Sequence, residues 1–132
     1  MNINAGIDEA GRGCIIGPLF IAGVTLNDFH IKELQQLGVR DSKLLSSKNR
    51  KKFYHIINNL VSEKCVYKIA PSQIDQYVKY KKLNYLTAIN MAKILDKLQA
   101  DHYYIDSSDV NTDRFKATII ENSTKKVDIT CR

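Results

Sequence analysis

The residues best suited to chemistry are three carboxylates next to short apolar runs. Asp8 and Glu9 come directly after the run Ile3–Ile7, and Asp106 ends the run that starts at Tyr103. If both runs are strands and lie side by side, about 4.8 Å apart, the carboxylates of Asp8 and Asp106 converge. Two carboxylates that close need a cation to ionise together, and oxygen ligands of this kind suit Mg²⁺ or Mn²⁺. Each acid taken alone is better explained by a loop that begins after a strand.

A glycine-rich turn follows the first two acids. Gly11, Arg12 and Gly13 can expose backbone N–H and C=O groups to a ligand, because glycine has no side chain. Arg12 adds a fork that fits phosphate or carboxylate. A tight turn with a solvated arginine explains these residues equally well. The later polar triplet Asp41-Ser42-Lys43, in which Lys43 could hold a phosphate, is a weak signal by itself.

The glycine spacing also resembles a loosened dinucleotide-binding fingerprint, with Gly17 as the third glycine. That fingerprint needs a helix directly after the glycines, whose N-terminus takes the pyrophosphate. Here Pro18 and the strand-like stretch Leu19–Val24 follow. The two acids before the glycines would also repel phosphate unless a metal intervened. We therefore reject the dinucleotide interpretation.

Apolar periodicity predicts the elements that must position these residues. The predicted strands are Ile3–Ile7, Leu19–Leu26, Cys65–Ala70, Tyr103–Asp106 and Val127–Cys131. The predicted helices are Phe29–Leu37, a short stretch from Pro71 to Tyr80, Asn84–Gln99 and Thr112–Ile120. A further helix is predicted to begin after a cap at Ser46 or Ser47, with Phe53, Ile56, Ile57 and Leu60 on its apolar face. The residues predicted to face inward from the last two helices are Ala88, Met91, Ala92, Leu95 and Leu98, and Phe115 and Ile119.

The order of the elements predicts an α/β fold with a mixed five-stranded sheet flanked by helices. The first two strands are close enough in sequence to form an antiparallel hairpin with a wide loop. Later strands alternate with helices, and a right-handed crossover can bring the fourth strand parallel to the first. A chain of 132 residues and 15.0 kDa is the size of one domain.

Composition excludes several classes of protein. With 44% hydrophobic and 26% charged residues, the chain is neither disordered nor of low complexity. We see no apolar run of the ~18 residues that a membrane span needs and no signal peptide, so we expect a cytoplasmic protein. Cys14, Cys65 and Cys131 form no metal-binding pair, and we expect them to be reduced. The net charge of +6 favours a polyanionic partner, although a solvated basic surface explains it as well.

Three motifs in order resemble the type 2 ribonucleases H, the ribonuclease HII family. They are Gly6-Ile7-Asp8-Glu9-Ala10-Gly11-Arg12-Gly13 with Gly17-Pro18, then Val39-Arg40-Asp41-Ser42-Lys43, then Tyr104-Ile105-Asp106-Ser107-Ser108-Asp109-Val110 in the archaeal style. The resemblance covers essentially the whole chain. It implies a ribonuclease H-like fold and endonucleolytic cleavage of RNA in RNA–DNA hybrids and at ribonucleotides embedded in duplex DNA.

The resemblance also implies roles for individual residues. The family holds two divalent metal ions, Mg²⁺ or Mn²⁺, with four carboxylates, of which Asp8, Glu9 and Asp106 match three. Gly11, Arg12 and Gly13 match the turn that contacts the ribose next to the scissile phosphate, and Lys43 matches a phosphate-binding lysine. One ion would activate water and the other stabilise the leaving 3′-oxygen, which leaves 5′-phosphate products. The exposed backbone of the turn can read the 2′-hydroxyl that distinguishes RNA from DNA.

The chain departs from the family pattern in two ways. Cys14 replaces a proline common after the turn. Family members are usually longer by many tens of residues, so we expect residues 1–132 to be a catalytic domain truncated before the fourth acid and the C-terminal helices. Asp128 lies near the C-terminal end of the chain, where the fourth acid is expected. We expect it at the start of the fifth strand, however, before the position of that acid in the family, so we do not expect it to be the fourth ligand.

Two alternatives to an active nuclease stay open at this point. The chain could be a catalytically incomplete fragment that binds nucleic acid, or a fragment that folds only with a separate C-terminal piece. We also expect Val127, Ile129 and Cys131 to form an apolar row that needs a covering partner. The consequence would be self-association through the uncovered C-terminal edge.

Overall fold

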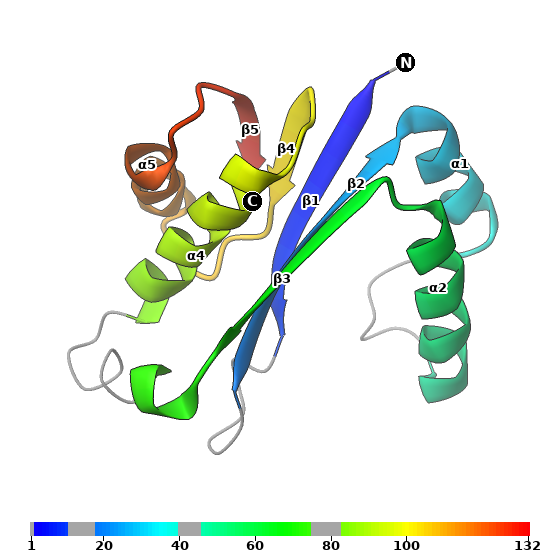
Figure 1. Cartoon of the computed structure of the whole chain (residues 1–132), viewed down its shortest axis with the longest axis horizontal. Helices are drawn as coiled ribbons and strands as arrows, with labels where there is room; N and C mark the ends of the chain where they lie inside the picture. The colour runs from blue at the N-terminus through cyan, green and yellow to red at the C-terminus, as the bar shows by residue number, and fades with distance from the viewer. Residues whose placement is uncertain (1, 11–17, 40–45, 75–82) are drawn as a thin grey trace.

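The fold is a single five-stranded sheet with helices on both sides (Figure 1). The structure is a computed structural model and describes residues 2–10, 18–39, 46–74 and 83–132. The strands are β1 (Ile3–Ala10), β2 (Leu19–Asn27), β3 (Glu63–Ile69), β4 (His102–Ile105) and β5 (Asp128–Cys131), in the spatial order β3-β2-β1-β4-β5. The predicted mixed α/β sheet is therefore confirmed.

The first three strands form an antiparallel meander. β1 pairs with β2 from Ile3 opposite Asn27 to Ala10 opposite Phe20, and β2 pairs with β3. The prediction that the first strand ends at Ile7 is wrong, because the ladder with β2 continues through the two acids to Ala10. Asp8 and Glu9 are therefore strand residues, whose side chains point to opposite faces of the sheet.

The other two strands run parallel to β1. β4 lies beside β1 with Ile105 opposite Ile7, and β5 lies beside β4 with Cys131 opposite Ile105. The crossover from β3 to β4 passes through helix α4 (Leu83–Lys97), and the crossover from β4 to β5 passes through α5 (Thr112–Asn122). The predicted parallel placement of the fourth strand beside the first is confirmed.

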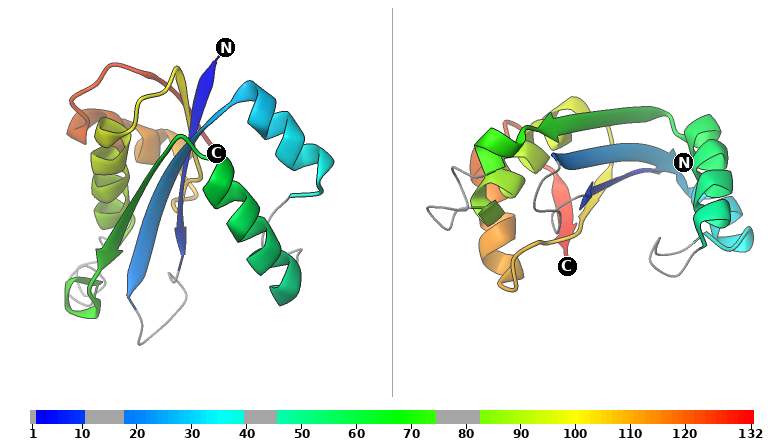
Figure 2. Two further views of the ribbon diagram at one scale, coloured as in Figure 1. Left: turned by 45° about the vertical axis from the view of Figure 1, so that its right-hand side comes forward. Right: turned by 90° about the horizontal axis from the view of Figure 1, so that it is seen from below.

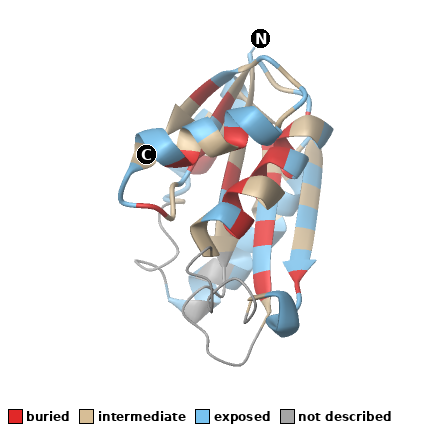
Figure 3. Cartoon of the chain, turned by 90° about the vertical axis from the view of Figure 1, so that its left-hand side faces the viewer, coloured by how far each residue is buried: buried red, intermediate tan, exposed pale blue. Residues whose placement is uncertain are grey.

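The core lies between the sheet and α4. The inward residues predicted for this helix and its C-terminal extension are all buried, and Figure 3 shows buried residues along α4 and on the strands behind it. Gly23 in β2 allows this close approach, because a Cβ atom there would lie 2.5 Å from Ile94 Cγ2 and 2.8 Å from Leu98 Cδ1. A larger residue at position 23 would push the helix away from the sheet.

The apolar row of β5 is already covered within the chain. Ile129 is buried in the core cluster, and Val127 and Cys131 are partly buried against it, on the side where α5 packs. The expectation that this row needs a covering partner is therefore wrong. The uncovered face of β5 carries Asp128 and Thr130 instead, because side chains alternate along a strand.

Two further helices lie on the opposite side of the sheet (Figure 2). They are α1 (Asp28–Gln36), capped by Asn27, and α2 (Ser47–Leu60), capped by Ser46 Oγ, which accepts from the Asn49 amide. Both helices were predicted, and the choice between Ser46 and Ser47 as the cap is now settled. Leu34 and Phe53 are buried, whereas Ile56, Ile57 and Leu60 are only partly buried. Much of the sheet face on this side is consequently open.

Candidate active site at the ends of strands β1 and β4

Asp8 and Asp106 lie next to each other at one edge of the sheet. Ile7 and Ile105 are register partners in the parallel pair of β1 and β4, and the Asp106 amide donates to the Ile7 carbonyl at 3.3 Å. Each aspartate follows its isoleucine, so the two occupy matching positions on adjacent strands. The prediction that they sit side by side on parallel strands is confirmed. We call Asp8 and Asp106 the acid pair.

Both members of the acid pair line an open pocket of about 530 Å³ on the sheet face away from α4. Gly6 and Ala22, which are small, lie beside Asp8 in the wall of this pocket, and a Cβ atom at Gly6 would meet nothing within 4 Å. Tyr104, Thr130 and Arg132 complete the side formed by β4 and the end of β5. Small residues on the two central strands thus leave room for a ligand in front of the carboxylates.

Asp8 and Glu9 do not act as one cluster in this structure. The Glu9 amide donates to Asp8 Oδ1 at 2.7 Å, which holds the Asp8 carboxylate near its own backbone. The Glu9 side chain is half-buried on the same face as Ile7, whereas Asp8 is exposed. Within residues 2–10, 18–39, 46–74 and 83–132, no three His, Cys, Asp or Glu residues group closely enough to hold a metal ion. Among the described residues, Asp8 and Asp106 supply carboxylate oxygens at neighbouring positions, which is the ligand type that Mg²⁺ and Mn²⁺ prefer.

The loop after β4 is held from two directions. The Ser107 amide donates to the Arg132 carbonyl at 2.6 Å, and the Arg132 amide donates to the Ile105 carbonyl at 3.1 Å. These bonds tie the backbone on both sides of Asp106 to the end of β5. The Ser107 hydroxyl also donates to the Asp109 carbonyl and accepts from its amide. The backbone position of Asp106 is therefore fixed although its side chain is exposed.

An ion pair between the buried Asp109 and the exposed Arg114 anchors the far end of the same loop. Asp109 is 7% exposed, and its carboxylate accepts from Arg114 Nε and Nη2, both at 2.8 Å, and from the Asn111 amide at 3.0 Å. The hydrogen bonds to Asp109, and its charge, raise the pKa of Arg114. From the sequence, Asp109 was expected only as a member of the third motif, without a role of its own. The signal was available, because Asp109 stands just before the helix cap Asn111 and five residues before Arg114.

With this geometry established, comparison with known proteins identifies the family. The family model for Ribonuclease HII matches residues 5–131. The chain belongs to the ribonuclease HII family. A Ribonuclease HII from Cenarchaeum symbiosum is 40% identical over 122 residues, which are 92% of this chain and 60% of that protein. The chain thus spans about 60% of the length of this ribonuclease HII relative.

Solved structures agree with the ribonuclease HII assignment. Ribonuclease H2 from Pyrococcus horikoshii superposes with a TM-score of 0.85 at 30% identity, over 98% of this chain and 62% of that one. A ribonuclease HII from Archaeoglobus fulgidus, solved in complex with PCNA, gives 0.82 at 35% identity, over 98% and 63%. The ribonuclease H-like fold predicted from the sequence is confirmed.

Asp128 lies at the other end of the strands that carry the ribonuclease HII acids. It begins β5, as predicted, and its Oδ2 lies 2.7 Å from Nδ1 of His102, the first residue of β4. Thr130 Oγ1 lies 2.7 Å from the other ring nitrogen of His102. At 3.3 Å per residue, four residues of strand separate His102 from Asp106 by about 13 Å. Asp128 is therefore remote from the acid pair.

The remaining predicted site residues of the ribonuclease HII motifs lie outside the described residues. These are Gly11, Arg12 and Gly13 of the first turn and Asp41, Ser42 and Lys43 of the second motif. Their assignments stay predictions. In the part of the chain that the structure describes, no helix is long and apolar enough to cross a membrane. Cys65 and Cys131 are free thiols, and Cys14 lies outside the described residues.

Proposed function

We propose that this ribonuclease HII chain hydrolyses the RNA strand of RNA–DNA hybrids, using Mg²⁺ or Mn²⁺ bound by Asp8 and Asp106. The observation that carries the proposal is the acid pair on adjacent parallel strands, facing an open pocket. Carboxylate oxygens are the ligands that these cations prefer. When bound, such a cation supplies a Lewis acid and a more acidic water molecule.

Other residues of the family motifs have distinct roles in this proposal. Glu9 contributes a third carboxylate, for which the backbone at the end of β1 must rotate, because Glu9 and Asp8 lie on opposite faces of the strand here. Gly11, Arg12 and Gly13 bind the ribose of the ribonucleotide, and Lys43 binds a phosphate. Recognition of a single ribose through its 2′-hydroxyl also allows cleavage at ribonucleotides embedded in duplex DNA.

We expect a second metal ion to bind more weakly than the first. Two divalent ions close together repel each other and need several carboxylates to offset this repulsion. Asp128 is hydrogen-bonded to His102 at the far end of β5, so we do not propose it as the fourth ligand. We propose that the 132-residue chain binds one Mg²⁺ or Mn²⁺ weakly and cleaves slowly. Binding without cleavage is the second candidate function, favoured by the same lack of a nearby fourth acid among the described residues.

Hydrolysis of two labelled substrates tests the proposal. One is an RNA–DNA hybrid, and the other is a DNA duplex with one ribonucleotide. We expect products with 5′-phosphate ends when Mg²⁺ or Mn²⁺ is present and none with a chelator. Asp8→Asn should abolish cleavage, while Asp128→Asn serves as the matched control and should cleave normally. Hybrid binding without metal-dependent cleavage would support the second candidate instead.

Self-association is a separate proposal, now placed on the open sheet face. Phe20 and Val66, which do not line the pocket of the acid pair, are 40% and 58% exposed and alternate onto that face from β2 and β3. A second copy that covered them would remove this apolar surface from water. Light scattering of the purified chain should give a mass above 15.0 kDa that falls toward 15.0 kDa when Phe20 and Val66 are replaced by Ser. A parental mass of 15.0 kDa at all concentrations would exclude self-association.

A further inference from the structure

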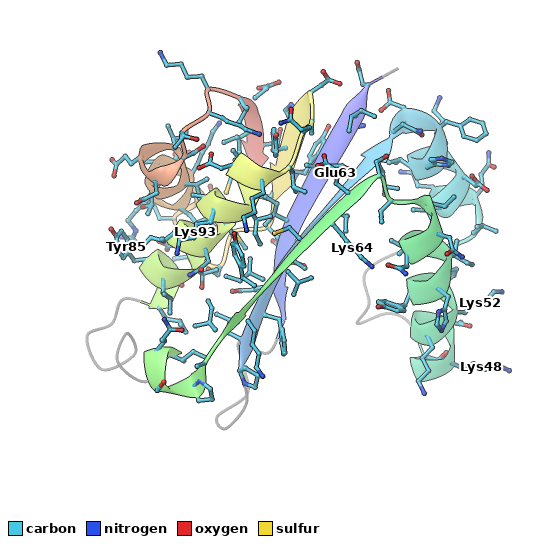
Figure 4. All side chains as sticks on the ribbon, viewed as in Figure 1. Lys48, Lys52, Glu63, Lys64, Tyr85 and Lys93 are labelled. Atoms are coloured by element: carbon cyan, nitrogen blue, oxygen red, sulfur yellow. The ribbon has the colours of Figure 1, made fainter. Side chains whose placement is uncertain are left out.

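The side of helix α2 that faces away from the sheet is strongly basic. Lys48, Lys51, Lys52 and His55 follow the i, i+3, i+4, i+7 spacing that places residues on one side of a helix, and all four are exposed. We call these four residues the α2 stripe. Figure 4 labels Lys48 and Lys52, whose side chains extend away from the sheet. The buried Phe53 belongs to the opposite side of the helix.

Nothing on the helix offsets this charge. The segment Ser47–Leu60 contains no aspartate or glutamate, and its four Lys and Arg residues supply +4 of the net charge of +6. Its first turn holds no acidic residue, although the helix dipole favours anions there. Among described residues, no salt bridge joins a lysine of the stripe to a carboxylate. The dipole and the lysines therefore combine to attract an anion.

The α2 stripe lies toward the same end of the molecule as the acid pair. β1 runs from the N-terminus toward Asp8, and the N-terminal end of α2 points to that same end in two views (Figures 1 and 2). Because the stripe faces away from the sheet, a ligand centred on the acid pair reaches it only if the ligand is extended and continues past the N-terminal end of α2. A nucleic-acid duplex is extended and carries negative charge along its whole length.

We infer that the α2 stripe binds the phosphate backbone of the duplex whose RNA strand lies at the acid pair. This inference rests on the proposed function and adds to it the surface that holds the duplex beyond the cleavage site. A helix rises 1.5 Å per residue, so Lys48 and Lys52 are about 6 Å apart along the axis. Successive phosphates of one strand are about 3.4 Å apart along a duplex, so the stripe matches about two of them. Lysine contacts to phosphate position a duplex without reading its sequence.

The salt dependence of hybrid binding tests the inference. We compare the parent with the triple variant Lys48→Gln, Lys51→Gln and Lys52→Gln, since glutamine preserves helix propensity. The matched control replaces three exposed lysines on other elements, Lys32, Lys93 and Lys126, by Gln. Both variants lose the same net charge, so only the position of the charge differs. Affinity for one RNA–DNA hybrid is measured between 50 and 200 mM salt.

The α2 variant should bind about tenfold more weakly at low salt, with a salt slope smaller by about two units. The control variant should change the slope by less than one unit. A triple Lys→Arg variant of the stripe should retain the parental slope, because it keeps the charge. Equal slopes for the α2 variant and the control, or no hybrid binding by the parent, would overturn the inference.

Cleavage by the same proteins separates the inference from the proposed function. Metal-dependent cleavage with equal slopes would leave the proposed function standing and remove the role of α2. A slope that depends on α2, without any cleavage, would support the stripe and count against hydrolysis by this chain. Duplexes in which two adjacent phosphates of one strand are replaced by neutral methylphosphonates should show which phosphates the stripe contacts. At those positions the replacement should weaken binding by the parent but not by the α2 variant.

Discussion

On the sheet face covered by α4, Ile7 and Ile105 are each 2% exposed, whereas Asp8 and Asp106, one residue further along the same strands, face an open pocket. The covered face is packed so closely that Gly23 has no room for a methyl group, while Gly6 on the open face has room to spare. Because side chains alternate between the two faces of a strand, β1 and β4 contribute residues to the hydrophobic core on one face and to the candidate site on the other. Substitutions on the covered face should therefore change stability, and those on the open face should change ligand binding.

Replacing one member of the acid pair should give the largest effect, and only on metal binding. At an effective dielectric constant of about 20, a carboxylate contributes about 4 kcal/mol per unit charge at 4 Å, so Asp106→Asn should weaken Mn²⁺ binding at least about 100-fold. The free energy of unfolding should stay within about 0.5 kcal/mol of the parent, because Asp106 is exposed. Calorimetric titration with Mn²⁺ and urea denaturation measure the two quantities. Asp128→Asn is the control, and an equal loss of Mn²⁺ affinity in it would contradict a site at the acid pair.

Arg114 should connect the two faces, since it lies on α5 but pairs with the loop that follows Asp106. Arg114→Gln should lower the free energy of unfolding, because the buried carboxylate of Asp109 loses two charge-assisted hydrogen bonds. It should also weaken Mn²⁺ binding, because the loop that carries Asp106 loses its anchor. Arg114→Lys, which keeps the charge but not the two-pronged geometry, should recover part of both losses. Unchanged Mn²⁺ affinity in a destabilised Arg114→Gln protein would show that the anchor stabilises the fold without positioning the acid.

The two strand glycines allow the same substitution on opposite faces. Gly23→Ala should destabilise the protein by about 1–3 kcal/mol, because the new methyl group overlaps Ile94 and Leu98. Gly6→Ala should leave stability unchanged or raise it by up to about 1 kcal/mol, since its methyl group meets nothing and the unfolded chain loses freedom. Thermal unfolding of both variants measures the difference. Equal destabilisation would mean that the open face is packed as tightly as the covered one.

The smallest effect should come from Cys131, which lies where β5 meets the covered face. Burial raises the pKa of the Cys131 thiol. The folded state therefore favours the neutral thiol, and this contribution to stability is complete below the ordinary thiol pKa of about 8.5 and lost as pH rises past it toward the folded value. Between pH 8 and pH 10, stability should thus fall less in Cys131→Ser than in the parent. Urea midpoints measure this difference, and the same midpoints at pH 7 and pH 8 serve as the control.

The sequence was sufficient for the sheet and for the position of two acids, because both depend on local patterns. Apolar runs located all five strands, and the short link between the first two predicted their hairpin. Glu9 was assigned together with Asp8 because the first strand was expected to end at Ile7. Pairing with β2 extends that strand to Ala10 and sends the two side chains to opposite faces. The length of a ladder depends on the partner strand, which local periodicity cannot supply.

Other features needed tertiary information of different kinds. Which side of β5 is covered follows from the position of α5, so the apolar row of Val127, Ile129 and Cys131 was misjudged as exposed. The bond between Asp109 and Arg114 joins a loop to a helix and leaves only a weak trace in the sequence. The α2 stripe, in contrast, is encoded locally, by the helical spacing of Lys48, Lys51 and Lys52 on the side opposite Phe53.

The strand order also determines when the acid pair can assemble during folding. Ile7 meets Gly23 of β2 only 16 residues along the chain, but meets Ile105 of β4 98 residues along it. Closing the longer loop costs about 1.6 kcal/mol more in chain entropy, and distant parallel pairings form slowly. We expect the β1–β2–β3 meander to gain protection from hydrogen exchange before β4 does. Asp8 would then be in place on the meander before α4 docks and β4 pairs with β1. Asp106 would join it only at that step, so the acid pair would form late in folding.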